Sequence, residues 1–132
     1  MLVKTYGAAV QGIDATLITI EVNVGKGEFG YTLVGLPDNA VKESYARVLT
    51  ALRNNGMDIP RTRITINLAP ADIKKEGSSY DLPIAMGILA AGGTINSEKV
   101  GEYMLLGELS LDGSIRPFKG HYLWQFKLER LD

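Results

Sequence analysis

The sequence predicts an α/β fold, an α+β two-layer sandwich in which two main helices pack on one face of a mixed sheet of five to seven strands. Segments of alternating apolar and polar residues predict the strands, and two segments with helical periodicity predict the helices. The chain has 132 residues, 45% of them hydrophobic and 22% charged, which is typical of one globular domain.

The first strands are predicted by side chains that alternate between two faces. Residues 14–24 read DATLITIEVNV, so isoleucine and valine recur at every second position from Ile18 onward, with polar residues between them. Residues 3–10 and 31–34 have similar character, and glycine-containing segments separate the three. We therefore expect three antiparallel strands at the start of the domain.

Two further strand regions follow later in the chain. In RTRITINLAP, Ile64 and Ile66 face one side while Arg61 and Arg63 face the other, which predicts a fourth strand. Residues 103–118, YMLLGELSLDGSIRPF, predict two short strands joined by a Leu-Asp-Gly turn.

The two helices have recognisable ends. Asp38 can cap a helix that starts after Pro37, and Gly56 can close it with a positive φ. A second helix is expected over residues 79–91, with Ser79 as its cap and Asp81 in its first turn, where negative charge is favoured. The core is expected at Ile18, Ile20, Val22, Val48, Leu52, Ile64, Ile66, Ile84, Met86, Leu89 and Leu105.

Composition argues against several function classes. Fourteen basic and fifteen acidic residues leave a net charge of −1, so any attraction to nucleic acid must be local. The chain has no cysteine, and its single histidine, His121, makes a zinc centre improbable. No window approaches the roughly 18 apolar residues of a membrane span. We expect a cytoplasmic protein.

The segment GKGEFG matches G-x-G-x-x-G, the pattern of dinucleotide-binding loops. Such a loop must open a helix, but the residues after Gly30 continue as a strand, so we interpret the segment as a hairpin turn. No Gly-x₄-Gly-Lys-Ser/Thr phosphate loop is present either.

Basic residues form one candidate interaction surface. Arg61, Arg63, Lys74 and Lys75, together with Arg53, are candidate contacts for DNA phosphates. The alternative is an ordinary solvent-exposed charged face, which the near-zero net charge favours.

The segment KKEGSSYDLPIAM raises the question of a serine nucleophile. Ser78 or Ser79 would need a lysine as base, because the only histidine lies near the C-terminus. The nearby lysines are Lys74, Lys75 and Lys119. Capping of the second helix is the competing explanation.

The hairpin sequence GELSLDGSIRP resembles the corresponding hairpin of the Lon protease proteolytic domain. Lon proteases use a Ser-Lys dyad, and the resemblance places the serine position on Asp81 and the lysine position on or near Tyr122. Ser78, Ser79 and Lys119 are offset by two or three residues, which turns a helical side chain toward another direction. The resemblance therefore implies that both dyad members are missing.

A closer resemblance covers residues 1–120 and rests on VGLP, V-x-E-S, NLAPAD and G-x-x-YDLPIA. These motifs resemble the N-terminal domain of magnesium-chelatase-like AAA+ ATPases of the ComM (YifB) competence-protein type. The resemblance implies a Lon-like domain of the ribosomal-protein domain-2-like superfold, with a left-handed crossover where periodicity alone favours a right-handed one. Residues 121–132 are expected to be a tail that departs from the family pattern.

For that family, the resemblance implies ATP-driven branch migration on DNA during uptake and recombination. ATP and Mg²⁺ are expected only in an AAA+ module, which is absent from this chain. We therefore expect a non-catalytic domain, with no cofactor or metal of its own, that supports ring assembly with its own AAA+ module or sibling subunits and guides DNA. The alternative is a Lon-like serine hydrolase that uses Ser79 or Ser78 with a nearby lysine.

Overall fold

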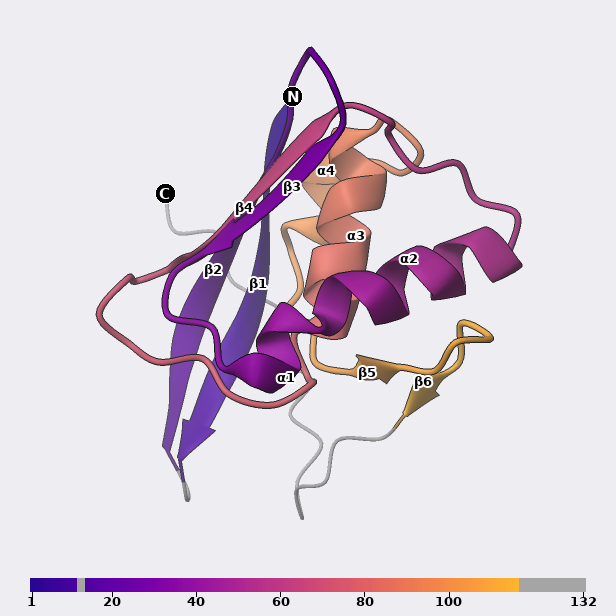
Figure 1. The fold of residues 1–132 in the computed structure, drawn as a ribbon. Coiled ribbons are helices and arrows are strands. Elements are labelled where there is room, and N and C mark those ends of the chain that lie inside the picture. Colours follow the sequence, from indigo (N-terminus) through magenta and orange to yellow (C-terminus); the bar gives the residue numbers. More distant parts are fainter. Residues whose placement is uncertain (12–13, 117–132) are drawn as a thin grey trace.

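The computed structural model describes residues 1–11 and 14–116 as two layers, a sheet with helices on one of its faces (Figure 1). This arrangement confirms the expected sandwich. The main sheet contains β1 (Leu2–Gln11), β2 (Asp14–Val24), β3 (Gly30–Val34) and β4 (Arg63–Ala69). The helices are α1 (Asn39–Lys42), α2 (Ser44–Asn54), α3 (Asp81–Ala91) and α4 (Ser97–Val100).

The strand order in the main sheet is β1-β2-β4-β3, which corrects one expectation. β1 and β2 are antiparallel, as expected, but β4 pairs with β2 and separates it from β3. β3 runs parallel to β4. The pairs Ile20–Leu68 and Val22–Ile66 place the apolar faces of β2 and β4 together, and this match decides the order.

The connection GKGEFG is therefore not a hairpin turn, because it passes the start of β4, which lies between β2 and β3. The Gly25 N–H donates to the Arg63 carbonyl at 2.9 Å, which holds the start of this connection against β4. It leads into β3 and opens no helix, as expected, so a dinucleotide loop is excluded here.

The sheet also has fewer strands than expected. The main sheet has four strands in the described residues, and β5 (Glu108–Leu109) and β6 (Ile115–Arg116) form a separate antiparallel pair. The turn of this hairpin packs against the end of α2, where Asn54 donates to the Leu111 carbonyl and Asn55 to the Asp112 carbonyl. These bonds hold the hairpin against α2, and it does not join the main sheet.

The first predicted helix is present but interrupted at Glu43, which separates α1 from α2. The Asp38 carboxylate accepts from the Val41 N–H at 2.8 Å, and Gly56 has a φ of 68°, so both predicted ends are confirmed. The short helix α4 was not expected.

The predicted cap of the second helix is wrong. α3 begins at Asp81 after Tyr80, and neither Tyr80 nor Ser79 provides a side-chain cap. Backbone groups of Gly107 take this role: its N–H donates to the Ser79 carbonyl, and its carbonyl accepts from the Leu82 N–H, both at 3.0 Å. A carbonyl from another segment thus satisfies a free N–H of the first turn.

The core lies between α3 and the sheet. The expected core residues are buried, except that Met86 and Leu105 are partly buried and pack against the others. Gly87 brings α3 close to β2, because a β-carbon there would lie 2.6 Å from Cγ2 of Val22. No helix in the described part of the chain is both long and apolar enough to cross a membrane.

Candidate functional site around Asp81

Asp81 occupies the position that the Lon resemblance assigns to the nucleophile, and its side chain is completely buried. Its carboxylate accepts from Arg47 at 2.6 Å (Nε to Oδ2) and 3.0 Å (Nη2 to Oδ1). The Leu109 N–H donates to Oδ2 at 3.1 Å. Asp81 therefore joins α3 to α2 and to β5.

Arg47 is held on several sides. Its guanidinium also donates to the Ala40 carbonyl at 2.8 Å, and its side chain is 21% exposed. The hydrogen bond to Asp81 is the main reason that the pKa of Arg47 is raised. A planar guanidinium that binds both carboxylate oxygens is the strongest form of protein ion pair. The position of a protease nucleophile is thus filled by a carboxylate whose oxygens are occupied by structural donors.

The serine alternative has no support among the contacts of the described residues. Ser78 and Ser79 are half-buried, and within residues 1–11 and 14–116 neither hydroxyl has a hydrogen-bond partner. Lys74 is exposed and lies 3.8 Å from Glu76. Lys119, His121 and Tyr122, the last of these being the expected lysine position, lie outside the described residues.

Lys75 is completely buried, so its assignment as a DNA contact is wrong. Its ammonium donates to the Gly35 carbonyl at 2.7 Å and to the Pro70 carbonyl. Its backbone N–H donates to the Leu36 carbonyl at 2.9 Å. Burial lowers the pKa of Lys75, because a charged ammonium loses its hydration. Lys75 connects the loop after β3 to the loop after β4.

Asp38 belongs to the same cluster of loop contacts as Lys75. The Asp38 N–H donates to the Lys75 carbonyl at 2.9 Å, and its Oδ2 accepts from the Gly77 N–H at 3.1 Å. Three of the motifs that carry the family resemblance, VGLP, NLAPAD and G-x-x-YDLPIA, therefore meet around Asp38 and Lys75. In this structure their contacts hold loops together.

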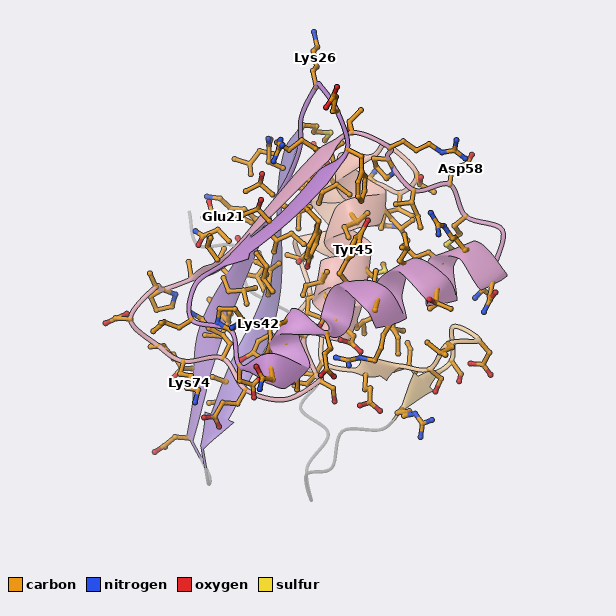
Figure 2. All side chains as sticks on the ribbon, in the orientation of Figure 1. Glu21, Lys26, Lys42, Tyr45, Asp58 and Lys74 are labelled. Carbon is orange, nitrogen blue, oxygen red and sulfur yellow. The ribbon has the colours of Figure 1, made fainter. Side chains whose placement is uncertain are left out.

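The basic residues do not form one surface. Figure 2 shows Lys74 at the opposite end of the molecule from Asp58, and Asp58 lines the same cleft as Arg61. This separation follows from β4, which begins at Arg63 and carries the chain across the sheet before Lys74. Arg53 and Arg61 line this cleft, Arg63 lies beside Gly30, and all three are exposed. We call these three residues the arginine group.

Sequence reasoning missed two residues of this region. Arg47 was only a polar position on a helix, and nothing local indicates that it meets a residue 34 positions later. Phe29, in the connection between β2 and β3, lines a cleft of about 380 Å³ beside Arg53 and Arg61. The signal available in the sequence was an aromatic residue within a glycine-rich segment.

Comparison with known proteins places the chain in a family. A family model described as subunit ChlI of Mg-chelatase matches residues 20–129. The chain belongs to this ChlI family. The matched region contains Asp38, Lys75 and Asp81, so the cluster described above lies inside the ChlI-like domain.

Several curated relatives are similar over most of the chain. It is 50% identical over 112 residues to the uncharacterized protein YifB of Escherichia coli, covering 85% of this chain and 22% of the relative. It is 46% identical over 119 residues to the competence protein ComM of Haemophilus influenzae, covering 90% and 23%. A Lon protease of Salinispora arenicola is 28% identical over 123 residues, covering 86% and 15%. The chain therefore spans less than a quarter of the length of these relatives.

Among the described residues of this ChlI-like domain, no group of three or more histidine, aspartate or glutamate side chains could hold a metal ion.

Proposed function

We propose that this ChlI-like domain is a non-catalytic part of a ComM-type AAA+ protein, where it supports assembly and guides DNA during uptake and recombination in the cytoplasm. The observation that carries the proposal is the buried pair of Asp81 and Arg47. A carboxylate that is completely buried and accepts three hydrogen bonds from structural donors is not accessible to a substrate. ATP and Mg²⁺ belong to the AAA+ module in this proposal.

The arginine group is the proposed DNA surface. Arg53, Arg61 and Arg63 are exposed, and none of them forms an ion pair with a carboxylate in the described part of the chain. Exposed guanidinium groups without a carboxylate partner can neutralise phosphates and release counterions. The net charge of −1 means that this attraction acts locally.

The test is binding of the 132-residue chain to labelled single-stranded, duplex and forked DNA, measured by fluorescence anisotropy at two salt concentrations. We expect salt-sensitive binding that is lost in the Arg61→Ala/Arg63→Ala variant. For duplex DNA, the log-log salt slope reports about 0.9 per neutralised phosphate.

The matched control is Lys42→Ala/Lys74→Ala, which removes the same charge from two exposed lysines outside the arginine group. This variant should bind DNA like the unaltered chain. Absence of binding tighter than about 10⁻⁴ M, the weak limit of ordinary non-specific affinity, would remove DNA guidance and leave assembly as the function of the domain.

A further inference from the structure

An open cleft of about 380 Å³ lies between α2, the connection after β2 and residues 57–61. Its lining includes Phe29, Tyr45 and Met57. Figure 2 shows Tyr45 extending from α2 toward the strands, while Asp58 lies in the segment that returns from α2 to β4. The volume falls within the usual range for sites that bind small organic groups.

One wall of the cleft is aromatic. The Tyr45 ring stacks on Tyr31 with centroids 3.9 Å apart and an interplanar angle of 22°. The Phe29 ring lies on the cleft side, 6.5 Å from Tyr45, and Phe29 is 57% exposed. Core packing does not explain this exposure, whereas an exposed aromatic face can stack on a planar ligand.

The rim of the cleft is positively charged. Arg53 and Arg61 line it, and the Arg63 guanidinium lies beside Gly30, where an added β-carbon would be 2.9 Å from Nη1. Because successive residues of β4 point to opposite faces and Ile64 faces the core, the Arg63 guanidinium lies on the other face of the sheet and is not part of this rim. Asp58 is the single carboxylate in the lining, and it pairs with none of these arginines.

We propose that this cleft holds one unstacked base of a single-stranded nucleic acid, with the base on Phe29 and the neighbouring phosphates on Arg53 and Arg61. Aromatic stacking combined with a cationic path for the backbone is the usual chemistry of single-strand recognition. An apolar protein side chain would fill the cleft but leave the arginines without an anion, which favours nucleic acid. The inference rests on the proposed DNA function, because it specifies the form of DNA bound.

The test compares two labelled probes of equal length and charge, an oligothymidylate and an abasic oligonucleotide of about ten nucleotides, by anisotropy on the 132-residue chain. We expect the oligothymidylate to bind about 5- to 150-fold more tightly, because stacking of one base contributes about 1–3 kcal/mol. Phe29→Ala should abolish this difference without changing the salt slope. Phe29→Tyr should retain it.

The matched control is Tyr103→Ala, which removes another exposed aromatic residue, 46% exposed, that is not in the cleft lining. This variant should keep the preference for base-bearing DNA, and circular dichroism should show that every variant is folded. Equal affinity for both probes, or a preference that survives Phe29→Ala, would overturn the inference while leaving the arginine group as a phosphate-binding surface. Absence of binding to any probe would instead defeat the DNA function itself.

Discussion

At the scale of single residues, Asp81 has a structural role at the position that the Lon resemblance assigns to a nucleophile. Its carboxylate is buried and receives three hydrogen bonds, two from Arg47 and one from Leu109. The sequence identified the position through the resemblance to Lon, but it indicated nothing about the partner. Its expected place in the first turn of α3 is confirmed, and the side chain also connects three elements.

We expect Asp81→Ala to lower the free energy of unfolding by about 3–5 kcal/mol, because it leaves the Arg47 guanidinium partly buried without its partner. Asp81→Ser should destabilise the domain similarly and create no hydrolase. Urea unfolding measures the first effect and reaction with a fluorophosphonate probe the second. Asp14→Ala, at an exposed aspartate, is the control and should change stability by less than about 0.5 kcal/mol. A stable, probe-reactive Asp81→Ser variant would contradict the structural role.

Tyr80 gives a prediction for pH dependence. Burial, with smaller contributions from Asp38 and Glu76, raises the pKa of Tyr80 from 10.0 to about 12. The unfolded chain therefore loses this proton first as pH rises, so the stabilising contribution is complete below pH 10 and decreases between pH 10 and about 12. Converted at the free energy that corresponds to one pKa unit, this pKa shift lowers the free energy of unfolding by about 3 kcal/mol.

The measurement is the free energy of unfolding of the unaltered chain and of Tyr80→Phe across this pH range. The difference between the two free energies of unfolding should be constant below pH 10 and change above it. Phenolate absorbance should show that the variant has one fewer tyrosine that ionises at high pH. A difference that is independent of pH throughout would show that Tyr80 titrates normally.

At the scale of elements, the loops after β3 and β4 depend on a buried lysine. We expect Lys75→Met to lower the free energy of unfolding by about 1–3 kcal/mol, because the carbonyl groups of Gly35 and Pro70 lose their donor. DNA affinity should not change, because Lys75 has no exposed surface. Thermal unfolding and anisotropy measure these two effects. Lys74→Met, at the exposed neighbouring lysine, should leave stability nearly unchanged.

Packing of α3 on β2 depends on Gly87. We expect Gly87→Ala to cost about 1–3 kcal/mol, because the new methyl group would overlap Val22 and force the helix outward. Gly101→Ala is the control, since its β-carbon would have no neighbour closer than 3.6 Å. Chemical denaturation should show a clearly lower free energy of unfolding for Gly87→Ala than for Gly101→Ala. Equal stabilities would show that α3 can shift at little cost.

At the scale of the whole molecule, the two-layer sandwich was predictable, but the strand order was not. Alternation in residues 14–24 and the caps at Asp38 and Gly56 are local features, and they correctly predicted one strand and both ends of the first helical region. The insertion of β4 between β2 and β3 reflects pairing between segments that are distant in the sequence, such as Val22 with Ile66. No local pattern encodes that choice.

The sequence by itself determined the position of the two main helices and most of the core, because these depend on residue type and short-range periodicity. Only the tertiary structure decided that Asp81 pairs with Arg47, that Lys75 is enclosed by carbonyl groups, and that Phe29 lies beside Arg61. The physical reason is the same for all three. Burial and partner choice are set by which distant segments pack together, and this information appears only when the chain is folded.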